Sequence, residues 1–148
     1  MLLRPSRAPS VALPFAARSV GHNWHLPHKH SVTKRLDFVQ VLWGIRGTGV
    51  IVMEGIERRL GPEQLGLYFP GNEHHYFSLD EPWDVRWWTM DGPLAASVTA
   101  ALGLSTGQIY EAGSAPVALF RKLEQAIRDV TPAGEYRASA LAYKLLVH

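Results

Sequence analysis

Residues 50–60 of the 148-residue chain read VIVMEGIERRL, and this stretch predicts a β-hairpin. Two strand-forming runs, 50–53 and 56–60, are separated by Glu54 and Gly55. A two-residue connection that ends in glycine suits a tight hairpin turn, because glycine adopts positive φ without a side-chain clash. Antiparallel β-structure is therefore expected in the first part of the chain.

The sequence on either side of this hairpin predicts further short strands. Apolar and aromatic runs at 36–43, 65–69, 74–79 and 84–90 are separated by Gly, Pro, Asn and Asp, which favour turns. Strands this short, interrupted this often, are typical of a sandwich or closed barrel and not of a parallel sheet.

The composition changes at Gly92-Pro93, after which alanine and leucine become frequent and helices are expected. Residues 117–130 carry apolar side chains at alternating spacings of three and four, which is the pattern of an amphipathic helix. Ser114 is the expected cap of this helix. The stretch 131–134 is expected to end it, and a third helix is expected from Glu135 onward. The fold class is therefore mainly β with C-terminal helices.

The composition indicates a single globular domain. Apolar residues make up 47% of the chain and charged residues 19%, which excludes a disordered chain and a membrane span. Lysine and arginine total 15 against 13 acidic residues, and because they are scattered, no phosphate-binding surface is expected. The absence of cysteine excludes disulfides and thiolate sites. We expect an N-terminal arm at 1–22, a barrel at 23–92 and a helical segment at 93–148.

Several motifs recur at characteristic separations in residues 36–88. They are Ile45-Arg46-Gly47-Thr48-Gly49-Val50, then Gly55, then Phe69-Pro70-Gly71-Asn72-Glu73-His74-His75-Tyr76, and finally Trp83 and Trp87. This order resembles the N-terminal domain of transcription regulators of the arabinose-regulator (AraC) type, and the helices extend the resemblance to His148. The resemblance implies a cupin-like jelly-roll β-barrel followed by an α-helical dimerisation segment.

The resemblance also implies a function. Such a domain binds a small-molecule effector, pairs as a homodimer in the cytoplasm, and has neither enzymatic activity, a cofactor nor membrane contact. The family usually continues into two helix-turn-helix units, and no such pattern is found in these 148 residues. DNA binding is therefore expected only through a domain absent from this chain.

Strand alternation selects the side chains that face the barrel interior, and it places Trp83, Val85, Trp87 and Thr89 on one face. The resemblance implies that Trp87 lines the pocket and that Tyr76 contacts the effector. An indole wall suits an aromatic or sugar-like ring, and a phenol can also hydrogen-bond a hydroxyl group. Core packing in a barrel without a ligand is the alternative.

Three further side chains are candidates for ligand binding. Val85 shares the face of Trp87, and His74 shares the face of Tyr76, whereas His75 is expected to point away. Arg35 lies where the resemblance implies a basic group near the effector, and a solvated role is its alternative.

A metal-dependent cupin enzyme is the second functional hypothesis. His28 and His30 form a His-x-His pair, and His74 or His75 would be the third ligand. Lys34 and Arg35 occupy the positions where such sites carry a glutamate, and two cations would repel the metal. No nucleophile motif or phosphate loop is found in the sequence.

The helical segment also carries candidate dimerisation residues. Its apolar positions recur on one side of each expected helix, as the resemblance to a dimerising segment requires. The two chains would then pair through Phe120, Leu123, Leu141 and Leu145.

Overall fold

The hairpin predicted at residues 50–60 forms, and it is one edge of the smaller of two β-sheets. Strand β5 (Gly49–Met53) pairs with β6 (Ile56–Leu60), and Met53 faces Ile56 at the turn. Glu54 and Gly55 both have positive φ, 50° and 75°, as a two-residue hairpin turn of this type requires.

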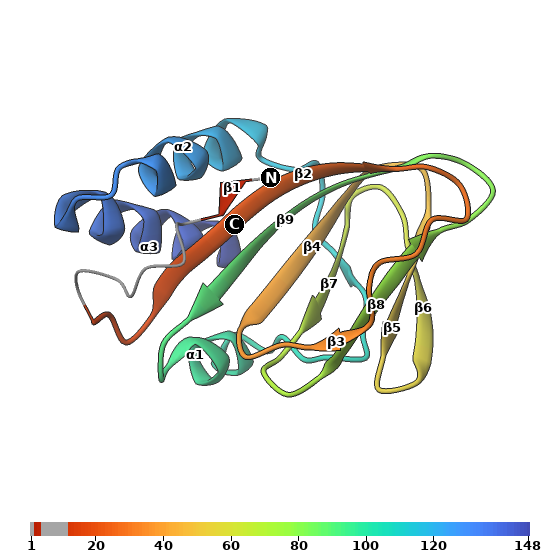
Figure 1. The fold of residues 1–148 in the computed structure, drawn as a ribbon, viewed down its shortest axis with the longest axis horizontal. Coiled ribbons are helices and arrows are strands. Elements are labelled where there is room, and N and C mark those ends of the chain that lie inside the picture. The colour runs from red at the N-terminus through yellow and green to blue at the C-terminus, as the bar shows by residue number, and fades with distance from the viewer. Residues whose placement is uncertain (1, 4–11) are drawn as a thin grey trace.

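The computed structural model describes residues 2–3 and 12–148, and its strands form two antiparallel sheets (Figure 1). The large sheet has the order β1 (Leu2–Leu3), β2 (Ala16–His25), β9 (Trp83–Asp91), β4 (Val39–Arg46), β7 (Gln64–Tyr68), β10 (Tyr110–Glu111). The small sheet has the order β3 (Lys34–Arg35), β8 (Glu73–Ser78), β5, β6. Within the described residues no strand pairing joins the two sheets, so the cupin-like barrel is not closed.

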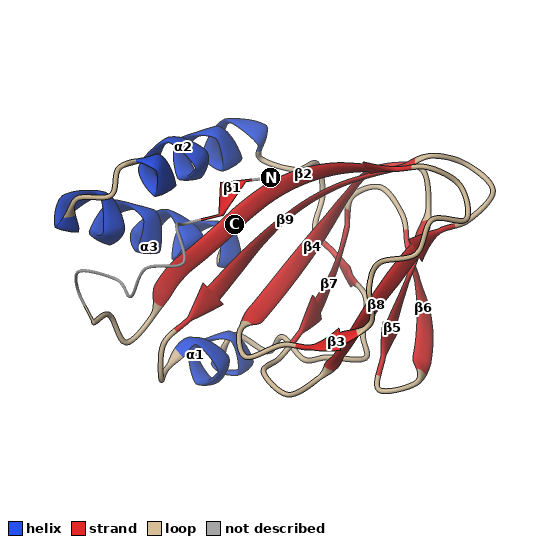
Figure 2. Cartoon of the chain, viewed as in Figure 1, coloured by secondary structure: helices blue, strands red, loops and turns tan. Residues whose placement is uncertain are grey.

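The helices of the described residues follow β9: they are α1 (Ala95–Ala101), α2 (Val117–Arg128) and α3 (Pro132–Leu146), with β10 between α1 and α2. Figure 2 shows α2 and α3 side by side against the large sheet, on the side away from the small sheet. None of the described helices has the length and apolar character needed to cross a bilayer. The predicted class, mainly β with C-terminal helices, is confirmed.

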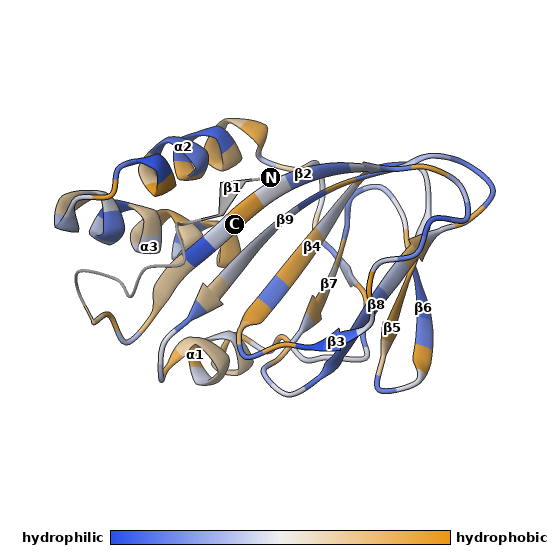
Figure 3. Cartoon of the chain, viewed as in Figure 1, coloured by the Kyte–Doolittle hydropathy of each residue, from blue (hydrophilic) through white to orange (hydrophobic). Residues whose placement is uncertain are grey.

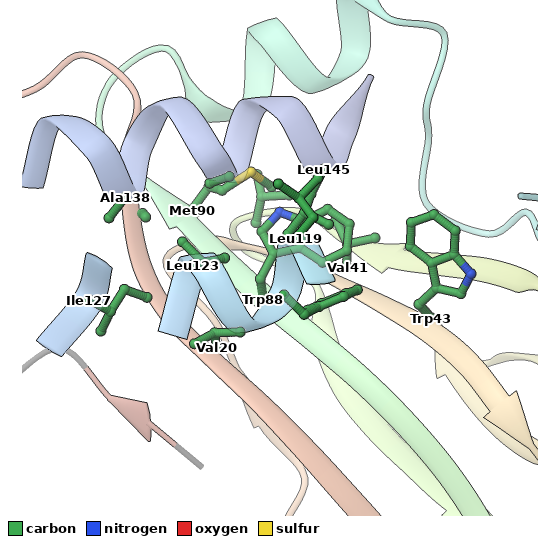
Figure 4. Packing of buried hydrophobic residues seen from close by; sticks show 14 of the residues in the cluster. Val20, Val41, Trp43, Trp88, Met90, Leu119, Leu123, Ile127, Ala138 and Leu145 are labelled. Atoms are coloured by element: carbon green, nitrogen blue, oxygen red, sulfur yellow. The ribbon is translucent and has the colours of Figure 1, made fainter. Parts of the chain in front are cut away.

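The helices bury a hydrophobic cluster that we call the helix core. Figure 4 shows Val20, Val41, Trp88 and Met90 of the large sheet meeting Leu119, Leu123, Ile127 and Leu145 of the helices. Phe120 is fully buried there, with its ring edge-on to Trp88 at 5.6 Å. Burying each such side chain contributes roughly 1.5–3 kcal/mol, so this cluster holds the helices on the sheet.

A second cluster, which we call the barrel core, lies between the two sheets. The large sheet contributes Leu42, Tyr68, Trp83, Val85 and Trp87, and the small sheet contributes Ile51, Met53, Leu60 and Tyr76. Strand β6, at one edge of the small sheet, is mostly polar. Figure 3 colours most of it hydrophilic, and only its last residue, Leu60, is buried. The small sheet therefore has one apolar side, which faces the interior, whereas the large sheet packs apolar side chains on both of its faces.

Three local predictions were wrong at the element boundaries. Residues 16–22, assigned to a loose arm, belong to β2, which pairs with β9 from Ala16 to His25; residues 4–11 of the arm lie outside the described residues. Ser114 does not cap α2, because its hydroxyl donates to Glu63 at 2.5 Å. Helix α3 begins at Pro132, three residues earlier than expected, with the Thr131 side chain accepting from the Gly134 amide.

Candidate ligand-binding site

Strand β9 presents alternate side chains to the two cores, as the sequence predicted. Trp83, Val85 and Trp87 point into the barrel core, whereas Trp88 and Met90 point into the helix core. One strand therefore forms both a wall of the barrel interior and the floor beneath the helices. Neighbouring residues on it can couple the two.

Tyr76 and His74 lie together in the interior, on β8. Tyr76 is 8% exposed and His74 is 4% exposed, and their rings are edge-on with centroids 4.8 Å apart. His74 also lies 4.7 Å from the ring of Tyr68. His75 points away, as predicted, and its Nε2 is 3.0 Å from Nδ1 of His30.

Trp87 is held in the interior by residues of β2. A Cβ atom at Gly21 would lie 2.3 Å from Cζ2 of the Trp87 indole, so a residue with no side chain is needed there. With its amide oriented to satisfy both neighbours, Asn23 accepts from Trp87 Nε1 at 3.2 Å and donates to the His22 carbonyl at 3.1 Å. Strand β2 therefore holds the indole in two ways: Gly21 packs closely against its ring, and Asn23 hydrogen-bonds its N–H group.

Sequence analysis missed the contribution of β2 to the interior. Ser19, Gly21, Asn23 and His25 recur at every second position, and Ser19 is hydrogen-bonded to the inward Thr89. The His25 ring lies 5.1 Å from that of Tyr76 and 5.5 Å from that of Trp83. Small and polar residues at every second position are the sequence signal for this strand. The signal was missed because the stretch has no row of apolar residues on one face.

Burial keeps the titratable interior groups neutral near pH 7. It lowers the pKa of His74 from 6.5 to about 4, and the charges of Lys34 and His75 act in the same direction. Burial also lowers the pKa of His25 and raises the pKa of Tyr76 and Tyr68. In each case the charged form is the one that loses hydration. The interior therefore offers neutral hydrogen-bonding groups.

Arg35 does not join the other predicted ligand-binding residues. It is exposed on the two-residue strand β3, and its guanidinium donates to the Gly71 carbonyl at 2.6 Å. Trp87, Tyr76, His74 and Val85 are brought together in the barrel, and Arg35 stabilises a turn at its edge.

The histidines of the alternative metal site are not brought together as a set of three, although His30 lies beside His75. The ring of His28 is 75% exposed and lies 3.8 Å from Asp80, whereas His30 contacts His75 and Phe77 on the outer face. His74 points into the interior instead. Across residues 12–148 no group of three or more His, Cys, Asp or Glu side chains could hold a metal ion.

The predicted dimerisation residues pack against other residues of the same chain. Phe120, Leu123 and Leu145 are buried in the helix core, and Leu141 is partly buried against it. They were assigned to an interface because an amphipathic stripe looks the same whether it faces a sheet or a second chain. Here the large sheet is the partner of that stripe.

A surface groove of about 270 Å³ lies elsewhere, on the outer side of the small sheet. It is lined by Val50, Glu57, Arg58, Arg59, Phe77 and Leu79. Phe77 and Arg59 face away from the barrel core, so this groove is separate from the interior described above.

The sequence comparison now decides the family. The family of the AraC-like ligand binding domain matches residues 17–146. The chain belongs to this family. The match covers the small sheet, the large sheet apart from β1 and the first residue of β2, and helices α1, α2 and α3, so the AraC-like domain includes β2 as well as the predicted barrel. No curated protein matches the sequence.

Solved structures that resemble the AraC-like domain include cupins. A cupin 2 conserved barrel domain protein from Salinispora arenicola is 16% identical, with a TM-score of 0.48 over 66% of this chain and 80% of the other. A predicted oxalate decarboxylase from Thermotoga maritima is 13% identical, with a TM-score of 0.46 over 49% of this chain and 65% of the other.

Proposed function

We propose that this AraC-like domain senses a small molecule held between its two sheets and passes the signal to an attached DNA-binding unit. The observation that carries the proposal is the pair Trp87 and Tyr76, both inside the barrel core of a chain that belongs to a ligand-binding family. The role is regulatory and non-enzymatic, and the domain works in the cytoplasm.

The effector is a sugar-like or aromatic molecule. Trp87 offers a broad aromatic face, and Tyr76 adds a hydroxyl group beside it. Aromatic faces pack on flat apolar surfaces such as a sugar ring or an arene, while hydroxyl groups fix the orientation of the bound molecule. Val85 and His74 complete the wall around this pair.

The signal leaves the interior through β9. Trp87 is the interior wall, and the next residue, Trp88, packs edge-on against Phe120 of α2. A ligand that favours one position of Trp87 thereby favours one position of the helices. Such a ligand shifts the populations of two arrangements by its difference in affinity for them.

Two AraC-like domains pair through their helical segments to form a homodimer. Because Phe120, Leu123 and Leu145 are buried within one chain, pairing uses the outward side of α3. Tyr136, Tyr143 and Val147 are exposed on that side and are spaced seven and four residues apart, which puts them on one helical face.

The test is a titration of the purified protein with a set of monosaccharides and small arenes. Intrinsic tryptophan fluorescence and thermal unfolding are the two readouts. We expect a member of the set to quench the fluorescence and raise Tm. Trp87→Ala should abolish the response, while Trp24→Ala, at an exposed position, should preserve it. A response that survives Trp87→Ala would contradict a site in the barrel interior.

A further inference from the structure

Four buried nitrogen atoms in the barrel have no hydrogen-bond partner within the described residues. They are Nδ1 and Nε2 of His74, Nε2 of His25 and Nε1 of Trp83. Buried polar groups in folded proteins are nearly always hydrogen-bonded, because an unpaired one has lost water and gained nothing. Four in one place call for an explanation.

These atoms belong to side chains that touch one another. The Tyr76 ring has His74 edge-on at 4.8 Å and His25 edge-on at 5.1 Å. The Trp83 indole lies 5.5 Å from His25 and 6.0 Å from Tyr76. Strands β2, β8 and β9, from both sheets, therefore bring the unpaired nitrogens around a single tyrosine.

The helix core provides an internal comparison. Its single unpaired buried side-chain nitrogen among the described residues is Nε1 of Trp88. One indole N–H in a hydrocarbon core is an isolated imperfection of packing. A group of two imidazoles and an indole around Tyr76 is a concentration of hydrogen-bonding capacity.

Among the residues that the structure describes, no charged side chain is buried in the barrel interior. The buried charged side chains of the described residues are Arg86 and Glu135; Arg86 faces Glu124 of α2 at 3.4 Å, and Glu135 lies on α3. Lys34 is near His74 but is exposed. An ion that entered the barrel would lose its hydration without meeting a buried partner of opposite charge.

We propose that His25, His74 and the Trp83 indole N–H form a hydrogen-bonding group that binds an uncharged, hydroxylated molecule and discriminates against its charged analogues. This inference rests on the proposed function, because it assigns the chemistry of the effector in the same interior. His25 and Trp83 become specificity-determining residues beside Trp87 and Tyr76.

The donor and acceptor pattern explains why hydroxyl groups fit. A neutral imidazole has one donor and one acceptor nitrogen, and an indole has a donor only. Hydroxyl groups can accept from Trp83, can both donate to and accept from the two nitrogens of His74, and can take either role with Nε2 of His25. A carboxylate only accepts and an ammonium only donates, so either would leave part of the group unpaired.

A first experiment needs no ligand. His74→Leu and His74→Phe replace the imidazole and its unpaired nitrogens with an apolar side chain. Because no hydrogen bond is lost, Tm of the ligand-free protein should stay unchanged or rise. Trp88→Phe is the matched control in the helix core, and Trp83→Phe should behave as the histidine variants do. A fall in Tm for both His74 variants would overturn the proposal, since the imidazole would then be a structural group.

The second experiment compares matched probes by calorimetry. D-glucose and D-galactose are each compared with their uronates and 2-amino derivatives, and benzyl alcohol is compared with benzoate and benzylamine. We expect the neutral member of a set to bind about tenfold or more tightly than its charged partners. His74→Leu and His25→Leu should each weaken the neutral probe about tenfold.

The outcomes separate this inference from the proposed function. Tighter binding of a uronate, benzoate or amine would overturn the neutral specificity and leave the sensing role intact. Binding of a neutral probe that is unchanged in both histidine variants would also overturn it. If no probe of any charge binds, the sensing role itself is contradicted and this inference is lost with it.

Discussion

The helix core and the barrel core share strand β9, yet they are built from different chemistry. The helix core is composed of aliphatic and aromatic side chains whose packing joins two helices to a sheet. The barrel core includes tyrosines and is bordered by two histidines, His25 and His74, with unpaired nitrogens. A core that only stabilises a fold has no need of such groups, so the contrast separates the supporting half of the molecule from the binding half.

The largest effect is expected from truncation in the helix core. Phe120→Ala should lower the free energy of unfolding by about 3–5 kcal/mol, because the ring is fully buried against Trp43 and Trp88. Urea denaturation followed by circular dichroism measures the loss. Val130→Ala, at an exposed position, is the control and should change stability by about 0.5 kcal/mol or less. Equal losses in the two variants would contradict the assignment of the helix core.

Acid should weaken the barrel core next. The pKa of His74 is lowered to about 4 in the folded protein, so the unfolded chain takes up the proton first as pH falls. The stability is complete above pH 6.5 and declines as pH falls toward 4. At about 1.4 kcal/mol for each tenfold change in proton affinity, the loss is up to roughly 3 kcal/mol.

Comparison with a variant isolates this contribution of His74. The unfolding free energy of wild type should fall relative to that of His74→Leu between pH 7 and pH 4.5, because only wild type carries the imidazole that the unfolded chain protonates first. The lowered pKa of His25 leaves a smaller slope in the same direction. Parallel pH profiles for the two proteins would show that His74 titrates normally in the folded state.

A methyl group at Gly21 should have a smaller effect on stability and a clear one on binding. Gly21→Ala forces the Trp87 indole to move, because the new Cβ would overlap its ring, and overpacking of this kind costs about 1–3 kcal/mol. Tryptophan fluorescence should shift, and effector binding should weaken. Ser97→Ala, at an exposed position of α1, is the control. An unchanged emission spectrum would contradict the contact.

The smallest effect on folding is expected on the outward side of α3. Tyr136→Glu with Tyr143→Glu should change monomer stability by about 1 kcal/mol or less in total, yet abolish dimerisation. Sedimentation velocity measures the association. Val130→Glu, another exposed apolar position, is the control and should remain dimeric. A dimer that persists in the double variant would locate the interface elsewhere.

Local patterns were read correctly where neighbouring residues determine the outcome. The hairpin depends on Glu54-Gly55, and the two faces of β9 follow from alternation along one strand. The pairing of β2 with β9 joins His25 to Trp83 across 58 positions of sequence, and no local signal marks it. Residues 16–22 were therefore missed as part of the barrel, and His25 was missed as a residue of its interior.

By itself the sequence determined that the chain is mainly β with C-terminal helices, and its spaced motifs indicated the family. The resemblance to the family assigned Trp87 and Tyr76 to the interior, and the alternation of side chains along a strand added Val85 and His74 to the same faces. The tertiary structure decided which partner each apolar stripe meets. It assigned Phe120 and Leu123 to the sheet instead of a second chain, because burial depends on which surfaces pack together. It also brought His25 from β2 beside Tyr76 from β8, a contact made by the packing of two sheets and visible in neither strand alone.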